Sequence, residues 1–135
     1  MLEFNQVIKM KWISTIKAIG PNAISEKDRV VILFGQTAKD ELQDVSVIQA
    51  FDDEQAAQAV VLKKGDTVTI DGTTFLINYV GPMAVSNLRA LQHASLFFTD
   101  KVPKKPMSNA LYLDLPEDQE MPKFRVDDEI VYEHL

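Results

Sequence analysis

The amino-acid sequence predicts a mostly β fold: a small closed or intertwined β-barrel or β-sandwich that carries one short α-helix. Short apolar runs rich in β-branched and aromatic residues alternate with turn residues along the chain, which is typical of such folds. Apolar side chains at helical spacing occur in one segment, residues 83–92. The length of 135 residues and the apolar content of 46% suffice for one hydrophobic core, so we expect a single domain over residues 1–135.

Several apolar runs predict strands, and they cover residues 12–19, 29–34, 45–51, 94–98, 110–115 and 129–133. The clearest hairpin spans residues 67–80, where Val68 and Ile70 alternate with threonines and Asp71-Gly72 supplies the turn. A two-residue hairpin turn needs positive φ at both central positions, and Asp-Gly is a favoured pair there. We therefore expect a tight hairpin.

Residues 83–92 predict the helix. Ala84, Leu88 and Leu91 fall at i, i+4 and i+7 and form an apolar stripe. Pro82 suits the first helical turn, where its missing N–H breaks no hydrogen bond. A short turn over residues 42–46 is the only other helical signal, so we expect no second helix of any length.

The composition excludes several classes of function. The chain has no cysteine, which excludes disulfides, thiolate nucleophiles and sulfur-ligated metals, and two histidines argue against a zinc site. No glycine-rich loop or nucleophile elbow is present, so we expect no cofactor. No run reaches the roughly 18 apolar residues of a membrane helix, and the N-terminus lacks the apolar core of a signal peptide. We expect a cytoplasmic protein without direct membrane insertion.

The net charge of −6 bears on partners. The phosphates of nucleic acids bind clusters of Lys and Arg. Here the only basic doublets are Lys63-Lys64 and Lys104-Lys105, and both flank turn residues. We therefore expect no nucleic-acid binding, and a basic protein partner is electrostatically favoured. The acidic pairs Asp52-Asp53 and Asp127-Asp128 stand in polar loops, and we interpret them as solvated turns rather than catalytic dyads.

His93 is the candidate ionisable group, because it follows the helical stripe directly and precedes an apolar strand. One interpretation is structural: a partly buried imidazole that hydrogen-bonds a backbone group at the end of the helix. The other is a phosphoryl acceptor, or a partner to one. His134 is penultimate in the chain, and we expect it to be frayed.

A motif within residues 75–98 points to a known family. It reads Val80-Gly81, Ala84, Asn87-Leu88, Leu91, His93, Leu96 and Phe98. The motif resembles the glucitol/sorbitol-specific IIA component of the bacterial phosphoenolpyruvate-dependent sugar phosphotransferase system (PTS). Phe34-Gly35 and Lys64-Gly65-Asp66 also fall at the family's spacing, so the resemblance covers nearly the whole chain.

The resemblance implies a small, mostly β, cytoplasmic phosphocarrier without cofactor or metal. Such a protein accepts a phosphoryl group from phospho-HPr on a histidine and passes it to a IIB partner, while the IIC component imports sorbitol/glucitol. A neutral imidazole nitrogen is the nucleophile in this chemistry.

Two residues depart from the family pattern. The family's acceptor histidine follows the strand matched by residues 45–48, and this position is Gln49 here. A carboxamide nitrogen is delocalised into its carbonyl and is not a useful nucleophile. Gln92 stands where the family usually has glycine before the later histidine. The candidate site residues are therefore Gln49, as the acceptor position, and His93, as a companion or surrogate.

Three interpretations follow. His93 could carry the phosphoryl group. The chain could instead be a non-phosphorylatable binding or regulatory module that docks on PTS proteins. It could also share only the fold of the family, with unrelated ligand binding. A homo-oligomer is plausible if exposed strand edges pair between chains.

Overall fold

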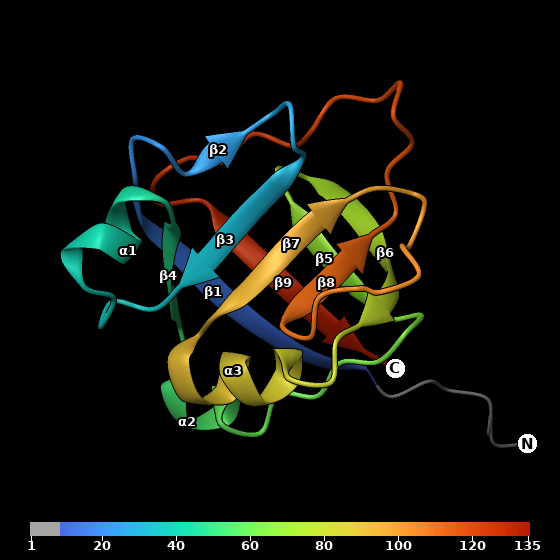
Figure 1. Ribbon diagram of the computed structural model, residues 1–135. Helices are drawn as coiled ribbons and strands as arrows, with labels where there is room; N and C mark the ends of the chain where they lie inside the picture. Colours follow the sequence, from blue (N-terminus) through green and yellow to red (C-terminus); the bar gives the residue numbers. More distant parts are fainter. Residues whose placement is uncertain (1–8) are drawn as a thin grey trace, which may run out of the picture.

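The computed structural model describes residues 9–135 and confirms the mostly β fold (Figure 1). The described strands form one nine-stranded sheet in the order β2-β3-β4-β1-β9-β5-β6-β8-β7, and an additional pairing of β3 with β7 closes it into a barrel. The strands are β1 (Met10–Ile19), β2 (Ile24–Ser25), β3 (Val30–Phe34), β4 (Val47–Phe51), β5 (Thr67–Ile70), β6 (Thr73–Val80), β7 (Ala94–Phe98), β8 (Ala110–Leu113) and β9 (Glu129–His134).

The closure of the barrel leaves little free strand edge among the described residues. Most neighbouring strands pair antiparallel, and β3–β4 and β7–β8 pair parallel. The two-residue strand β2 lies outside the closed ring and pairs with β3. Pairing of strand edges between chains, the route to a homo-oligomer considered from the sequence, therefore has little edge to use.

The predicted hairpin is confirmed. Strands β5 and β6 pair from Thr67↔Leu76 to Ile70↔Thr73. The two turn residues have positive φ, 55° at Asp71 and 72° at Gly72, as a type I′ turn requires.

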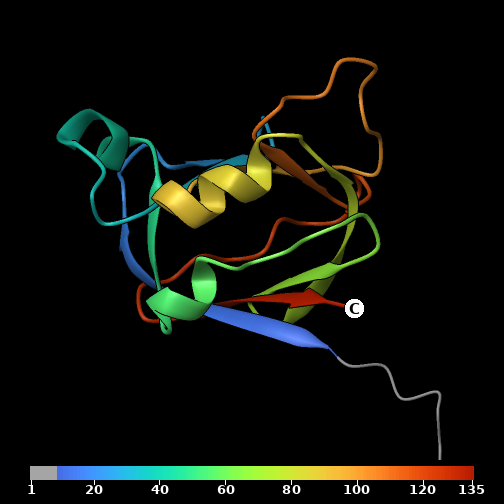
Figure 2. The same cartoon turned by 90° about the horizontal axis from the view of Figure 1, so that it is seen from below.

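The predicted helix is α3 (Ala84–Leu91), which lies across the lower opening of the barrel (Figure 2). Ala84 and Leu88 are fully buried, but Leu91 is 42% exposed, so its expected place on the buried stripe is wrong: it is the last residue of the helix. The position expected for Pro82 is also wrong, because Met83 is the N-cap. The backbone N–H groups of Gly81 and Met83 donate to Ala110 and Ser108, and these bonds hold the preceding segment outside the helix.

Two further helices of a single turn are present, α1 (Asp40–Asp44) and α2 (Glu54–Ala57). The first falls at the short turn expected near residues 42–46, and it delays the start of β4 to Val47. The Asp53 carboxylate caps α2 by accepting from the Ala56 N–H at 3.0 Å. Within residues 9–135, no helix has the length and apolar composition needed to cross a membrane.

His134 is not frayed, so that expectation is wrong. It lies in β9, and its Nδ1 is 2.7 Å from Oδ2 of Asp66. Asp66 is buried and also accepts from the backbone N–H groups of Lys63 and Leu135. This carboxylate therefore ties the last strand to the turn before β5.

We predict that this carboxylate contributes to stability in a pH-dependent way. Burial acts to raise the pKa of Asp66, but the hydrogen bonds from His134, Leu135 and Lys63 outweigh it, so the pKa lies below its usual value. The contribution is therefore present above about pH 4 and is lost as the pH falls below that value. Asp66→Ala should lower the free energy of unfolding at neutral pH by about 1–3 kcal/mol, since buried donors lose their acceptor.

Urea unfolding of the wild type and of Asp66→Ala at neutral pH and at about pH 3 tests this prediction. The loss of unfolding free energy caused by the substitution should be smaller at the acid pH. Asp118→Ala, a change at an exposed aspartate, is the matched control and should leave the stability near that of the wild type. A loss of equal size at both pH values would contradict the proposed role of the ionised carboxylate.

Candidate functional site

The structure places Gln49 inside the barrel. It lies in the middle of β4, between the core residues Val47 and Phe51 on the inward side of the strand, and is 0% exposed. Its Oε1 accepts hydrogen bonds from Ser14 Oγ at 2.6 Å and from the Tyr132 hydroxyl at 2.7 Å. Its Nε2 donates to the backbone carbonyl of Gln92 at 3.0 Å. The carboxamide is therefore engaged at both ends.

Gln92 follows α3 in the left-handed conformation, with φ 54° and ψ 35°. Its own side chain reaches the same strand as Gln49, because its Oε1 accepts from the Phe51 N–H at 3.1 Å. Gln49 and Gln92, which the sequence predicts to depart from the family pattern, are therefore hydrogen-bonded to each other although they lie far apart in the sequence. Gly35 allows the end of α3 to approach β3, since a Cβ there would lie 2.9 Å from the Leu91 carbonyl oxygen.

His93 is half-buried and lies directly before β7. Its Nδ1 lies 3.0 Å from the Leu33 carbonyl oxygen. Because a carbonyl can only accept, Nδ1 carries the proton and Nε2 the lone pair. Asn109 Nδ2 donates to that Nε2 at 2.9 Å, and the ring packs on Phe34 with centroids 4.7 Å apart. The imidazole does bond a backbone carbonyl, but that carbonyl belongs to β3 rather than to the end of the helix.

The structure thus brings the two sequence-predicted site residues close together. Gln49 donates to the carbonyl oxygen of Gln92, which belongs to the peptide bond that links Gln92 to His93. Neither side chain presents a free nucleophile, because the Gln49 nitrogen is an amide and the His93 lone pair already accepts from Asn109. The arrangement is suited to holding α3 and β7 on the barrel.

Sequence reasoning missed three residues of this polar group: Ser14, Tyr132 and Asn109. Ser14 lies on the inward side of β1 between the core residues Trp12 and Ile16, so strand alternation could have marked its hydroxyl as buried. Tyr132 is inward by the same rule. Asn109 follows a polar loop, and nothing in the sequence connects it with His93.

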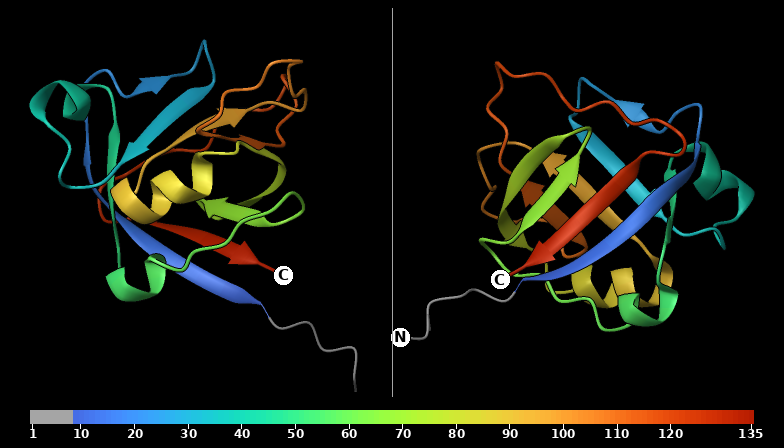
Figure 3. Two further views of the ribbon diagram at one scale, coloured as in Figure 1. Left: turned by 60° about the horizontal axis from the view of Figure 1, so that its bottom comes forward. Right: turned by 180° about the vertical axis from the view of Figure 1, so that it is seen from behind.

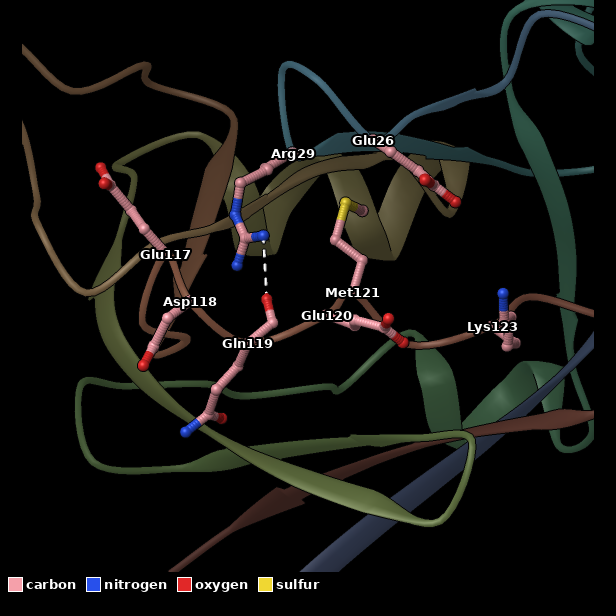
Figure 4. A pocket seen from close by; sticks show the side chains of 8 residues that line it. All are labelled: Glu26, Arg29, Glu117, Asp118, Gln119, Glu120, Met121 and Lys123. Carbon is pink, nitrogen blue, oxygen red and sulfur yellow. Dashed lines mark hydrogen bonds between the residues drawn. The ribbon is translucent and has the colours of Figure 1, made fainter.

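A separate surface pocket of about 280 Å³ lies near the start of β3 and contains none of these residues (Figure 4). Its charged side chains are Glu26, Arg29, Glu117, Asp118, Glu120 and Lys123. The Arg29 guanidinium donates to the carbonyls of Phe98, Pro116 and Gln119. Arg29 therefore fastens residues 116–119 to the barrel.

Comparison with known proteins identifies the class to which this fold and motif belong. A family model described as PTS system glucitol/sorbitol-specific IIA component matches residues 11–131. The chain is also similar to the crystal structure of a PTS system IIA component from Enterococcus faecalis V583, with 33% identity and a TM-score of 0.79 over 89% of this chain and 98% of that one. A search of curated protein sequences gives no match. The chain belongs to the PTS glucitol/sorbitol-specific IIA component family.

We predict that Tyr132 resists ionisation at alkaline pH. Burial raises its pKa, and the hydrogen bond to Gln49 opposes this only in part. The neutral phenol therefore contributes stability below about pH 10, which is lost as the pH rises further, because the unfolded chain releases its proton first. In a titration of tyrosine absorbance, one of the three tyrosines should ionise only as the protein unfolds. That step should disappear in Tyr132→Phe, and its persistence there would contradict the assignment.

We predict that the left-handed backbone at Gln92 is strained. Gln92→Ala and Gln92→Gly both lose the bond to the Phe51 N–H, but glycine adopts positive φ without penalty. Gln92→Gly should therefore be more stable than Gln92→Ala by about 1 kcal/mol. Urea unfolding of the two variants measures this difference, and equal stabilities would show that the conformation carries no strain.

Proposed function

We propose that this member of the family acts in the cytoplasm by binding PTS proteins, and that it carries no phosphoryl group at the family's acceptor position. The observation that carries the proposal is the state of Gln49, which is fully buried and hydrogen-bonded at both its oxygen and its nitrogen. It favours the binding or regulatory module over the relay.

The chemistry of transfer supports this choice. A carrier needs a nitrogen lone pair that attacks phosphorus, so that a new N–P bond forms as the bond to the donor breaks. The nitrogen of Gln49 has no such lone pair. A side chain with no exposed surface also leaves no space for a phosphoryl group or for the approach of a donor protein.

His93 is a poor substitute for the missing acceptor. Its Nε2 keeps a lone pair, but the Asn109 amide donates to it at 2.9 Å. Attack on phosphorus would break this bond and move the ring from its packing on Phe34.

The partners follow from the family: HPr, which donates to IIA components, and the sugar-specific IIB and IIC proteins. The retained fold supports retained docking surfaces, since the TM-score to the Enterococcus faecalis structure is 0.79. A IIA-like protein that docks without accepting phosphate would compete with a functional carrier for these partners, and so regulate the uptake of sorbitol/glucitol.

Intact-mass measurement tests the proposal. The protein is incubated with phosphoenolpyruvate, enzyme I and HPr, and we expect no acid-labile phosphoryl increment. Calorimetric titration with purified HPr or IIB should still show binding. A phosphoryl increment in the wild type that vanishes in His93→Ala would overturn the proposal and assign the relay to His93.

Restoring the family residues gives the matched positive control. Gln49→His supplies an imidazole, and Gln92→Gly removes the side chain that reaches across to Phe51. We expect Gln49→His alone to stay unphosphorylated, because the enclosed position is out of reach of a donor protein. We expect the double variant, which also lacks the Gln92 side chain that packs against β4, to gain phosphorylation. If the wild type binds neither HPr nor IIB, the docking role is wrong, whether or not the variants are phosphorylated.

A further inference from the structure

The outer surface of the barrel has two halves of different composition. On β1, β9 and β5, which lie toward the viewer in the right panel of Figure 3, most outward side chains are charged or hydroxylated. They include Lys11, Thr15, Thr67, Thr69, Glu129 and Glu133. The outward side chains of β3, β7, β8 and β6 include Ile32, Phe34, Phe97, Tyr112 and Tyr79. We call these five residues the aromatic face.

The aromatic rings of this face are contiguous across β7, β8 and β6, and on the neighbouring β3 Ile32 stands opposite Ser95 and Phe34 packs on His93. Phe97 stands opposite Tyr112, and Tyr112 stands opposite Tyr79. The rings of Phe97 and Tyr112 stack with centroids 4.8 Å apart. Tyr112, at the centre, is only 2% exposed, and the other four side chains are partly exposed and lie outside the barrel core. A contiguous apolar patch of this kind marks an interaction surface.

Two segments of opposite charge flank the aromatic face. In Figure 2, α1 (teal) and the β7–β8 loop, residues 99–109 (orange), project on the same side of the barrel, and Figure 1 shows β3 and β7 between them. The charged residues are Lys39, Asp40, Glu41 and Asp44 at α1, and Asp100, Lys101, Lys104 and Lys105 in the loop. One flank is therefore net acidic and the other net basic.

These charges form no ion pairs within the described residues, and only Asp44 among the α1 acids accepts a side-chain hydrogen bond, from Asn22 at 3.0 Å. Each flank also carries an exposed apolar side chain: Leu42 on α1 is 40% exposed, and Met107 in the loop is 52% exposed. The Met107 N–H donates to the Tyr112 hydroxyl at 3.1 Å, so the base of the loop is fixed against the aromatic face.

We propose that the aromatic face is a homodimer interface, with a second copy of this chain packed against it across a two-fold axis. An axis through the face exchanges its two sides, so the loop of one copy meets α1 of the other, and this contact occurs twice. Each contact pairs loop lysines with α1 acids around an apolar centre. This interface does not depend on the function proposed above.

The charge distribution favours a second copy over a different partner. Two copies of net charge −6 repel each other at long range, and an uncharged contact with compensating charges beside it offsets this repulsion. The aromatic face carries no charge, and its two flanks complement each other. A site for a purely acidic or purely basic partner would need only one of those flanks.

Sedimentation velocity of the full chain over a concentration series tests the proposal. We expect a dimer at protein concentrations on the order of 100 µM. Lys104→Glu/Lys105→Glu should raise the dissociation constant about tenfold or more. Lys63→Glu/Lys64→Glu, which changes the net charge equally at exposed residues outside the face, should leave it unchanged. A wild-type chain that stays monomeric, or equal effects of the two variants, would overturn the proposal.

Exchanging the charges of the two flanks shows whether a variant fails to dimerise because the charge pairs are lost or because it is unfolded. Asp40→Lys/Glu41→Lys should also weaken the homodimer, since both flanks are then basic. A mixture of this variant with Lys104→Glu/Lys105→Glu restores opposite charges at both contacts, so the heterodimer should form more tightly than either homodimer. Circular dichroism checks that both variants are folded. Failure of two folded variants to form the heterodimer would rule out the two-fold pairing.

Discussion

The buried carboxamide of Gln49 is the constraint on which the arrangement of the barrel depends. It connects β4 with Ser14 on β1, with Tyr132 on β9 and with the end of α3 at Gln92. A buried polar group left without partners costs about 1–3 kcal/mol, so any shift of one of these elements carries a penalty. Because the interior has a low dielectric, the satisfied bonds favour one arrangement strongly. The register of β1 between β4 and β9 and the position of α3 are therefore set together.

The same constraint explains why Gln92 keeps an unfavourable backbone. Its carbonyl can reach Gln49 because the chain turns sharply after α3, in the left-handed region that side chains other than glycine avoid. The Gln92 side chain offsets this cost through the Phe51 N–H. A glycine would make the turn without strain but would leave that buried N–H without its acceptor. The two glutamines thus form one unit, in which each stabilises the position of the other.

Much of the fold could be predicted from the sequence, because local rules decide it. The Asp71-Gly72 turn needs only its own backbone preference, and α3 needs only the spacing of Ala84 and Leu88. The closure of the barrel depends on the pairing of β3 with β7, far apart in the chain, and no local pattern records it. His134 was misjudged for the same reason, because its partner Asp66 is distant in sequence. The sequence marked Gln49 and His93 as site residues, but the bonds that fix them come from other elements.

The enclosed polar interior and the aromatic face both favour our proposal that this barrel acts through its outer surface. An acceptor histidine at position 49 would need a side chain that a donor protein can reach, whereas Gln49 is enclosed by hydroxyl and carbonyl partners. Hydrogen bonds that hold a side chain this firmly serve the rigidity of the scaffold. A rigid barrel presents the aromatic face and its charged flanks in one fixed geometry, which lowers the entropic cost of association. An unreactive side chain at position 49 is thus compatible with binding outside, because the buried polar group lies on β1, β4 and β9 and the aromatic face on β3, β6, β7 and β8.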